Sequence, residues 1–446
     1  MMGLRRKFPS GERRAVCFAA RCLMFCGVAT LCWSQQYTSY ERDEVQTMLR
    51  NIADEVKRHY YDPQLHGIDF DAKVREAREK IDQADSLNRG LSQVAAMLDN
   101  LHDSHTFFLP PPRPYVHDYG FRMQMIGDHC FVVRVRPGSD AETKGLKPGD
   151  EVLGVNSYAP AREDFWKMEY VYNVLRPQPG LNLNLRTATG GQRQVLVNAK
   201  IRELPAVRDL TGDRIFDLIR DMEDEEQVLR VRYAEKGHDL LIIKLPQFLL
   251  PPSEVDSLLG KMRNYNAVVF DLRGNPGGSE DTLRSLLGGL FENKVKIGER
   301  VGRSSTKVVE TEARYHPFTG KLAVLLDGKS ASASELFARV VQIEKRGLIV
   351  GDHSSGGVME AKHYSYKLGM SRVVFYGASI TEADFRMADG QSLEHTGVVP
   401  DTVILPTASD LASGRDPVLA KAAEMMNVKM SSEEAGTLFP YEWPKE

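Results

Sequence analysis

The sequence has few cysteines, almost no excess charge and, after residue 40, no apolar run long enough to cross a bilayer. Four of its five cysteines lie between residues 17 and 32, so the rest of the chain keeps only Cys130 and no disulfide framework. Cys130 sits in an apolar run, which predicts a buried structural thiol and argues against a cysteine peptidase. The formal net charge of −3 gives no reason to expect nucleic acid as a partner.

The N-terminus differs from the rest of the chain. Residues 1–14 are rich in basic side chains, residues 15–33 are apolar apart from Arg21, and a polar stretch begins at Gln35. This order is typical of a secretory signal peptide. We therefore expect a signal at residues 1–35 and a secreted or periplasmic location. The alternative is a buried or anchoring helix, and membrane contact is expected only through this segment if it stays uncleaved.

A chain of 446 residues is too long for one ordinary domain. Residues 37–114 have apolar side chains at helical spacing and end in a proline cluster. Residues 115–203 instead show short alternating runs separated by turn signals, which predicts a small β-rich domain. In residues 204–410, apolar strands alternate with helices, which predicts an α/β domain. Residues 411–446 read as a tail with one helical stretch near 417–426.

Several elements can be placed individually. In the helical region, the expected helices span Tyr40–Tyr61, Asp71–Gln83 and Leu91–Leu101. In the α/β domain, the expected strands are Asp239–Leu245, Ala267–Leu272, Leu322–Leu326, Leu348–Val350 and Val373–Tyr376, and the expected helices are Asp281–Phe291 and Ser334–Glu344. The segments with chemical potential fall at the ends of these elements.

Ser332 lies in Lys329-Ser-Ala-Ser-Ala-Ser-Glu335, between an expected strand and an expected helix. A helix N-terminus favours developing negative charge, which suits a nucleophile. The spacing Ser332-x-x-Glu335 is also a capping box, so a purely structural role explains the local sequence equally well. Ser330 and Ser334 are further candidates by residue type.

A glycine-rich turn, Asp271-Leu-Arg-Gly-Asn-Pro-Gly-Gly278, follows one of the buried strands. Gly277 and Gly278 allow backbone amides to approach a ligand closely, and such amides can bind an oxyanion or a phosphate. The spaced glycines and the lysine of nucleotide-binding loops are missing, which argues against a nucleotide. A tight strand–helix turn without a ligand is the alternative.

Two other segments hold groups that can assist a serine. His102-Asp-Ser-His105 supplies histidine, the usual base near neutral pH. The His-x-x-His pair also suggests a metal, but no matching Cys/His cluster appears elsewhere, so we expect neither metal nor cofactor. Glu394, in Glu394-His-Thr-Gly-Val-Val-Pro-Asp401, can orient another catalytic group. An ordinary surface loop is the alternative for both segments.

Residues 135–156 resemble a PDZ domain, with a strand, a short helix, the turn Gly-Leu-Lys-Pro-Gly-Asp and a second strand. The resemblance implies that residues 115–203 capture a peptide by strand addition at an exposed edge. Tyr119-Gly120-Phe121 would be the carboxylate-binding loop, with an ordinary strand entry as the alternative. A module of this kind can also serve as a packed spacer.

Together these segments resemble the C-terminal-processing (tail-specific) and tricorn-like serine peptidases with a PDZ domain, over residues 90–405. The resemblance implies an α/β core of ClpP/crotonase-like strand–helix type. It also implies Ser332 as nucleophile, with the amides of Gly277 and Ala333 as oxyanion hole. The processing branch uses a lysine, but Gly357 stands at its position here.

The tricorn-like branch instead uses a Ser-His pair ahead of the PDZ region and a later glutamate. Ser104-His105 and Glu394 match these elements. The implied machinery is a tetrad in which His105 takes the proton of Ser332, while Glu394 and Ser104 orient the histidine. Lys362 remains the candidate base for a Ser-Lys dyad.

We therefore expect a serine peptidase that hydrolyses peptides or unstructured proteins, with an oligomer left open. The first alternative is a Ser-Lys processing peptidase. The second is a catalytically inactive protein of the same fold that binds peptides or apolar ligands.

Overall fold

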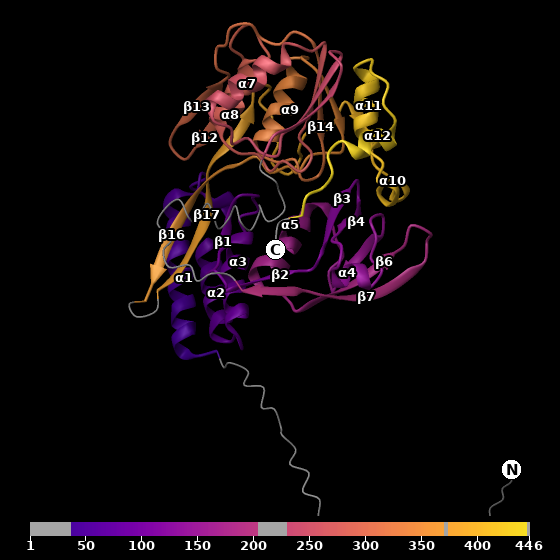
Figure 1. Cartoon of the computed structure of the whole chain (residues 1–446). Coiled ribbons are helices and arrows are strands. Elements are labelled where there is room, and N and C mark those ends of the chain that lie inside the picture. Colours follow the sequence, from indigo (N-terminus) through magenta and orange to yellow (C-terminus); the bar gives the residue numbers. More distant parts are fainter. Residues whose placement is uncertain (1–36, 204–229, 370–372, 444–446) are drawn as a thin grey trace, which may run out of the picture. The chain divides into compact units, whose positions relative to one another are not determined.

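The computed structural model describes residues 37–203, 230–369 and 373–443 (Figure 1). The predicted signal peptide, 1–35, lies outside these residues. Within them, no helix combines the length and the apolar character that a membrane span requires.

The first described region is helical, as the sequence predicts. Its helices are α1 (Ser39–His59), α2 (Phe70–Asp82) and α3 (Leu87–Asp99). Their apolar faces form one core, which includes Ile52 and Leu98 together with Tyr376 and Ile380 from a distant strand. The helical region is therefore fixed to the α/β part by shared burial of apolar surface.

Residues 121–198 form a five-stranded antiparallel sheet in the order β3-β4-β5-β6-β7. The strands are β3 (Phe121–Ile126), β4 (His129–Val135), β5 (Glu151–Val155), β6 (Gly180–Arg186) and β7 (Gln192–Asn198). Helices α4 (Asp140–Thr143) and α5 (Phe165–Tyr170), η2 (Arg162–Asp164) and the π-helical turn η3 (Val171–Leu175) complete this unit. Cys130 is buried in its core, as predicted. The PDZ interpretation of this unit stays a prediction.

A six-stranded sheet in the order β18-β15-β14-β11-β10-β9 forms the centre of the α/β domain. Its strands are β9 (Arg232–Lys236), β10 (Leu240–Lys244), β11 (Ala267–Asp271), β14 (Lys321–Leu326), β15 (Leu348–Gly351) and β18 (Thr402–Val403). Only β9 is antiparallel to its neighbour. All five residues of β11 are buried, which is why this strand reads as a continuous apolar run.

Helices cover both faces of this sheet. One face carries α7 (Pro252–Met262), α8 (Glu280–Gly288) and α9 (Ala333–Ile343), and the other carries α11 (Pro417–Met425) (Figure 1). The tail contains more helix than the single stretch we predicted, since α10 (Ala408–Ser413) and α12 (Ser432–Thr437) flank α11. These two are short and capped by Thr407 and Ser431, so they offer little periodicity for a sequence pattern to detect.

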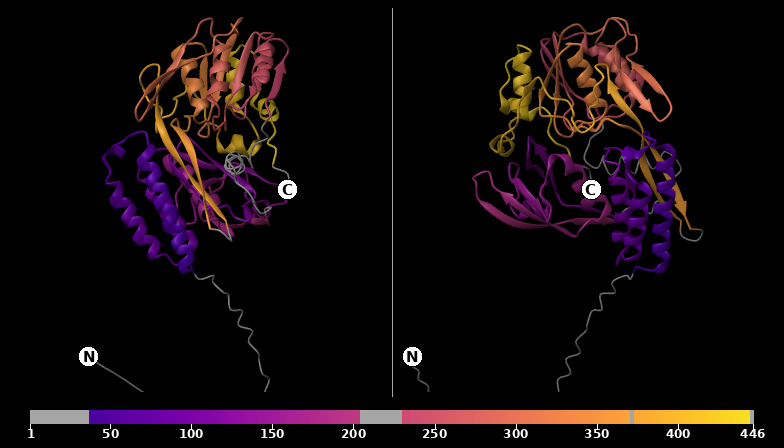
Figure 2. Two further views of the ribbon diagram at one scale, coloured as in Figure 1. Left: turned by 90° about the vertical axis from the view of Figure 1, so that its left-hand side faces the viewer. Right: turned by 180° about the vertical axis from the view of Figure 1, so that it is seen from behind.

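A second five-stranded sheet joins the helical region to the α/β domain (Figure 2). It consists of β1 (Phe107–Leu109), β12 (Lys296–Gly302), β13 (Thr306–Glu310), β16 (Glu360–Leu368) and β17 (Val374–Met387). Strand β1 pairs with β17, so that Phe107 lies opposite Ser379. The remaining strands, β2 (Tyr115–Asp118) and β8 (Lys200–Glu203), pair with each other. The β1–β17 pairing carries the segment before Phe107, including His105, to the α/β domain.

Candidate active site

Ser332 lies between the end of β14 and the first residue of α9, at the edge of the sheet where the parallel strands end. It is half-buried, and its backbone has φ 53° and ψ −118°. The other Ser and Thr residues that begin described helices all have negative φ, between −153° and −73°. Glu335 accepts the Ser332 N–H as in a capping box, but an N-cap residue usually has extended backbone, and the sparsely populated conformation of Ser332 is a kind that clusters at functional sites.

Ser330 and Ser334 are fully buried and serve the backbone. The Ser330 hydroxyl donates to the Leu272 carbonyl at 2.9 Å, and that of Ser334 donates to the Asn275 carbonyl at 3.0 Å. Both hydroxyls therefore tie the Ser332 segment to the glycine-rich turn. Of the three serines, Ser332 has the exposure and the strained backbone expected of a nucleophile.

Glu335 is a buried carboxylate that holds the Ser332 segment against the loop 354–357. Its Oε2 accepts the N–H groups of Ser332 and Gly357 at 2.9 and 3.1 Å. Its Oε1 accepts the Ser354 hydroxyl at 2.6 Å and the Gly356 N–H at 2.7 Å. Burial raises the pKa of Glu335 to about 7, while these four donors act in the opposite direction because they favour the charged form. The sequence pattern identified Glu335 only as a capping residue.

We expect Glu335→Gln to impair the site without touching the reacting atoms. An amide has one oxygen, so its NH2 group would face two backbone or hydroxyl donors that now find an acceptor. Peptide hydrolysis should fall about 10²-fold, or by about 3 kcal/mol in transition-state stabilisation, and the melting temperature should also fall. The control is Glu344→Gln at the end of α9, which should leave both quantities unchanged. Unchanged hydrolysis in Glu335→Gln would refute this positioning role.

The glycine-rich turn lies directly against Ser332. A β-carbon on Gly277 would lie 2.7 Å from Ser332 Cβ and 3.0 Å from Ala333 N, and Gly277 has φ 108°. The Gly277 N–H donates to Asn275 Oδ1 at 2.8 Å, so the predicted oxyanion donor is engaged by this side chain. Among the described residues, neither Ala333 N nor Gly278 N has a hydrogen-bond acceptor. Gly278 is thus a second candidate donor beside Ala333.

Gly277→Ala tests this close approach. The added methyl group would collide with Ser332, and φ 108° is strained for any residue with a β-carbon. We expect peptide hydrolysis to fall at least about 10²-fold, the loss that follows removal of one oxyanion donor. Gly274→Ala is the matched control, because Gly274 belongs to the same turn at φ 72° but has no atom within 4 Å of the added carbon. Equal losses in both variants would assign the effect to backbone strain alone.

His105, Ser104 and Glu394 form a hydrogen-bonded relay. The Ser104 hydroxyl lies 2.9 Å from Glu394 Oε2 and 2.6 Å from His105 Nδ1. Because a carboxylate only accepts, the single hydroxyl proton points to Glu394, and Ser104 Oγ accepts the Nδ1–H of His105. This assignment leaves Nε2 of His105 unprotonated and able to take a proton. Ser104 N and Val358 N also donate to Glu394, at 2.7 and 2.9 Å.

Asp103 fixes the backbone of the relay at His105, a role that the sequence did not suggest. Its Oδ1 accepts the N–H groups of His105 and Thr106 at 2.9 and 2.6 Å, and the Thr381 hydroxyl at 2.8 Å. Asp103 is buried, and Thr381 belongs to β17. The His105 backbone is therefore anchored to the strand that pairs with β1.

Gly357 contacts both halves of the site. Its carbonyl accepts the Ser332 N–H at 2.9 Å. A β-carbon on Gly357 would lie 3.3 Å from Ser104 Oγ and 3.7 Å from His105 Cε1. The relay and Ser332 thus adjoin the same glycine, although Ser332 lies 227 positions after His105 in sequence. A side chain at position 357 would approach Ser104 and His105.

The alternative base, Lys362, is exposed on β16, and its ammonium group lies 5.3 Å from the centre of the Tyr364 ring. His102, the other member of the His-x-x-His pair, has φ 52°, and its carbonyl accepts from His395 Nε2 at 2.8 Å. Over the described ranges, no group of three or more His, Cys, Asp or Glu side chains is arranged to hold a metal ion.

A buried ion cluster fixes the start of the glycine-rich turn. Asp271 accepts from Lys244 at 3.1 Å and from Arg273 at 2.8 Å, and Arg273 also contacts Asp416 at 2.7 Å. The two cations lower the pKa of Asp271, whereas burial alone would raise it. Removing one member of such a cluster leaves an uncompensated buried charge, so these residues serve the architecture of the turn.

The predicted carboxylate-binding loop adjoins β3. The side chains of Tyr119 and Phe121 belong to the core of the β-rich unit, and the Tyr119 hydroxyl donates to the Gln178 carbonyl at 2.9 Å. The Gly120 N–H donates to Asp118 Oδ1 at 2.9 Å. Any contribution of Tyr119 and Phe121 to peptide binding would therefore come from their backbone.

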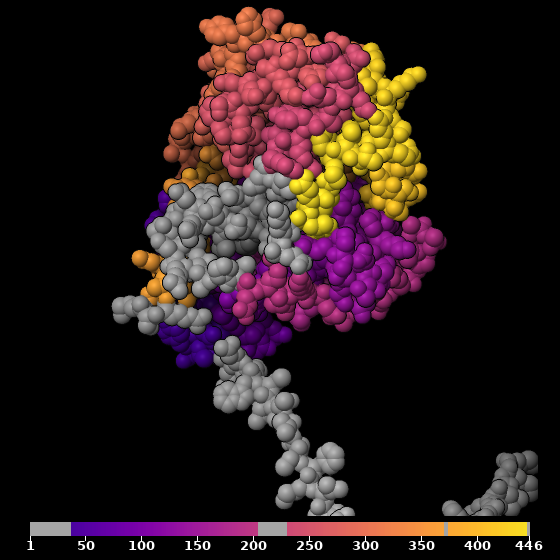
Figure 3. Space-filling view, in the orientation of Figure 1, coloured from indigo at the N-terminus to yellow at the C-terminus, as the bar shows by residue number. Residues whose placement is uncertain are grey.

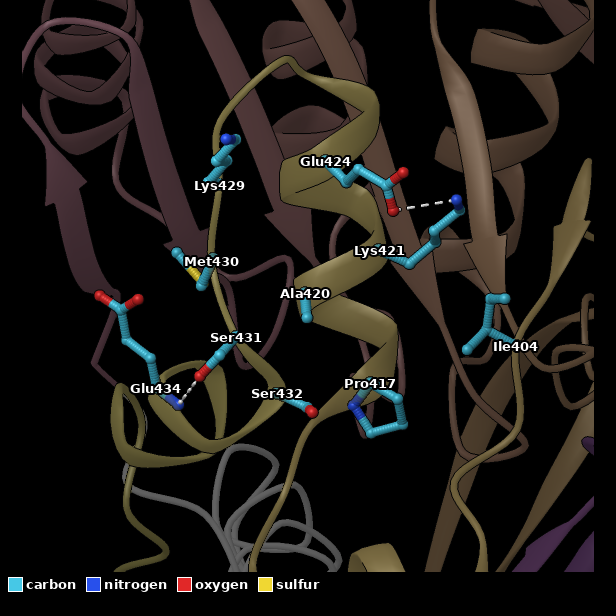
Figure 4. Close-up of a pocket in the computed structure, with 10 residues that line it drawn as sticks. All are labelled: Ile404, Pro417, Ala420, Lys421, Glu424, Lys429, Met430, Ser431, Ser432 and Glu434. Atoms are coloured by element: carbon cyan, nitrogen blue, oxygen red, sulfur yellow. Dashed lines mark hydrogen bonds and ion pairs between the residues drawn. The ribbon is translucent and has the colours of Figure 1, made fainter.

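One pocket of about 760 Å³ lies away from these residues, against α11 and α12 (Figure 4). Its lining includes Pro417, Glu424, Met430 and Ser432. Figure 4 shows Lys421 and Glu424 paired on α11. The pocket contains none of the candidate catalytic residues.

A strained serine between a strand and a helix, a glycine turn beside it and an oriented histidine are features of serine hydrolases built on an α/β sheet. Residues 239–404 match the family model of peptidase family S41. This match agrees with the family resemblance that the sequence predicts.

Known proteins are similar to this chain over much of its length. A tail-specific protease of Haemophilus influenzae is 26% identical over 320 residues, covering 67% of this chain and 43% of that protein. A carboxy-terminal-processing protease of Bartonella bacilliformis is 29% identical over 231 residues, covering 48% of this chain and 50% of that protein. The chain spans half or less of the length of these two relatives.

A solved structure of mature CPAF complexed with lactacystin shares the fold, with a TM-score of 0.63 and 14% identity. The match covers 87% of this chain and 98% of that one. It agrees with the mixed α/β class predicted from the sequence.

Proposed function

We propose that this protein is a serine peptidase that cleaves peptides or unstructured proteins through Ser332, His105, Glu394 and Ser104. The observation that carries the proposal is the Glu394–Ser104–His105 relay, which fixes the His105 tautomer beside the loop that also holds Ser332. The family match supports the reaction class. Lys362 makes a poor base here because its ammonium group lies over Tyr364.

The reaction then follows the covalent route of serine peptidases. His105 Nε2 takes the hydroxyl proton of Ser332 as Oγ forms a bond to the peptide carbonyl carbon. The carbonyl oxygen becomes negatively charged, and the amides of Ala333 and either Gly277 or Gly278 stabilise it. The peptide C–N bond breaks, and the leaving amine takes the proton from His105. Water, deprotonated by His105, then attacks the acyl carbon. The bond to Ser332 Oγ breaks, Oγ takes the proton back from His105, and the acyl group leaves as a carboxylic acid.

Strand β3 is the proposed entry for substrate. It is an edge strand of its sheet, so an extended peptide can pair with it. Gln124 in this strand donates to Asp327 at 2.8 Å, only five positions before Ser332. A peptide captured on β3 by a PDZ-like mode would therefore begin near the loop of the nucleophile. We place this activity outside the cytoplasm, in keeping with the predicted signal peptide.

The proposal is tested with a fluorogenic unstructured polypeptide and an activated fluorophosphonate. The expected result is hydrolysis together with a covalent label on Ser332. A protein that binds the polypeptide but neither cleaves it nor accepts the label would support the inactive binding alternative. Labelling of Ser332 that depends on Lys362 and not on His105 would support the Ser-Lys alternative.

A further inference from the structure

The last described residues of the chain, Tyr441–Trp443, lie against arginines of two different sheets. We name these five arginines the arginine site: Arg122, Arg134, Arg136, Arg230 and Arg232. Figure 3 shows the C-terminal residues, in yellow, between the α/β domain and the β-rich unit. The contacts follow the alternation of an extended chain, in which successive side chains point to opposite sides.

The two aromatic residues of this segment face the β-rich unit. The Trp443 ring lies 5.1 Å from the Arg122 guanidinium and 4.7 Å from that of Arg136. The Tyr441 ring lies 5.6 Å from Arg134. Arg122 is opposite Arg134 in the β3–β4 ladder, so these side chains share one face of the sheet. Each contact is a cation–π interaction.

The acidic residue between them faces the α/β domain. Glu442 Oε1 accepts from Arg230 at 2.9 Å and lies 3.6 Å from Arg232. Arg232 also donates to the Pro440 carbonyl at 2.8 Å. The chemistry of the segment is thus aromatic, acidic, aromatic, and each part meets guanidinium groups that suit it.

Two observations distinguish this contact from ordinary packing of a chain end. The apolar core of the tail ends at Phe439; Pro440 is exposed, and Tyr441–Trp443 are only half-buried. The ion pair between Glu442 and Arg230 is open to solvent, and such surface ion pairs are individually weak and open to exchange. The second observation is position: Arg122 is the second residue of β3, and Gln124, two positions further along this edge strand, contacts Asp327.

We propose that Tyr441–Trp443 is an internal ligand of the arginine site, and that this site binds extended peptide segments in which aromatic residues flank an acidic one. While the segment is seated, it competes with such peptides for the start of β3. The binding claim stands by itself. The further claim that substrates of this chemistry are cleaved better once the segment is gone rests on the proposed function.

The test uses a fluorescent peptide of the sequence Phe-Pro-Tyr-Glu-Trp-Pro-Lys-Glu, which is residues 439–446 of this chain. Binding is measured by anisotropy in a Ser332→Ala background. Proteins compared are the full chain, a chain ending at Pro440, and Trp443→Ala. A short tether supplies its ligand at an effective concentration of about 1 mM, so truncation should tighten peptide binding about tenfold. Trp443→Ala should give a smaller gain of the same sign.

Trp166→Ala is the matched control, because Trp166 is another partly exposed tryptophan beside a cation, Lys167. It should leave peptide affinity unchanged. A second peptide, with lysine in place of the glutamate between the two aromatic residues, should bind the truncated chain about tenfold more weakly than the first. Equal affinity of the full and truncated chains for the first peptide, or equal affinity for both peptides, would overturn the proposal. If the truncated chain unfolds, Trp443→Ala decides.

Hydrolysis is measured separately with Ser332 intact. Faster cleavage by the truncated chain is expected for an unstructured substrate that contains the aromatic-acidic-aromatic pattern. If the peptide binds as expected but no chain cleaves any substrate, the arginine site stands and the proposed peptidase activity fails. If cleavage occurs and truncation changes neither binding nor rate, the activity stands and the internal ligand is refuted.

Discussion

Replacing Ser332 with alanine is expected to abolish peptide hydrolysis, with a loss in kcat/KM of about 10⁴-fold or more. The reason is chemical: the acyl-enzyme cannot form without Oγ, and only the binding and oxyanion groups remain to help water attack directly. The fold should survive, because Ser332 is half-buried and the Glu335 carboxylate can still accept the backbone N–H at this position. Hydrolysis of a fluorogenic polypeptide, followed in parallel with thermal unfolding, measures both effects.

Ser334→Ala is the control for that experiment. It removes a hydroxyl two positions away that donates to the Asn275 carbonyl, so it should cost about 1 kcal/mol of stability. Its kcat/KM should stay within about tenfold of the wild-type value, because the hydroxyl is fully buried and faces the glycine turn. The assignment of Ser332 would fail if Ser332→Ala kept its activity while Ser334→Ala lost it.

The sequence predicted the strands and helices next to the glycine-rich turn and Ser332 because each carries its own periodic signal. It missed β9, α7, β12, β13 and β16, and it gave only the first residues of β17, Val374–Met387. Strand β11 is buried over all its residues and reads as one apolar run. The segment after β14 is ambiguous in sequence, since Ser332-x-x-Glu335 fits a helix cap as well as a nucleophile. Only the backbone angle at Ser332 separates the two, and a positive φ on serine has no signature in a sequence pattern.

The support of the site could not be predicted because it depends on contacts between distant segments. Asp103 receives the Thr381 hydroxyl from 278 positions away, and Glu335 accepts groups of a loop that begins 19 positions after it. No spaced motif links Asp103 to Thr381, or Glu335 to the loop 354–357. The engagement of the Gly277 amide by Asn275 is local, but no sequence pattern marks it. The orientation of a side chain two residues away decides which amide of the turn is left to bind an oxyanion.

The Glu394–Ser104–His105 relay was predicted in part from the sequence and in part is supplied only by the structure. That Glu394 and Ser104 orient His105 was predicted from a family resemblance. The contact between Ser104 and Glu394, and its direction, come from the structure, since the hydroxyl proton must point to the carboxylate. Direction matters because it decides which nitrogen of His105 is the base.

We expect His105→Ala to lower kcat/KM by about 10⁴-fold, close to the effect of losing Ser332, because nucleophile and base act as a unit. Lys362→Ala is the control and should change kcat/KM by less than about twofold. The stability of His105→Ala should be close to that of the wild type, since Asp103 holds the backbone of this segment and not its ring. The reverse pattern, with Lys362→Ala inactive and His105→Ala active, would establish a Ser-Lys dyad.

The pH profile gives an independent readout of the same base. Burial lowers the pKa of His105 from its ordinary value of 6.5, and the charges of Glu394 and Asp103 oppose this shift. The ring is therefore neutral at pH 7, and kcat/KM should hold below pH 6.5 before it falls as the pH drops through the lowered pKa. Glu394→Gln removes one of the charges that raise the pKa, so the acid limb should move to lower pH while the rate also drops. A limb that stays in place would mean that a group other than His105 titrates there.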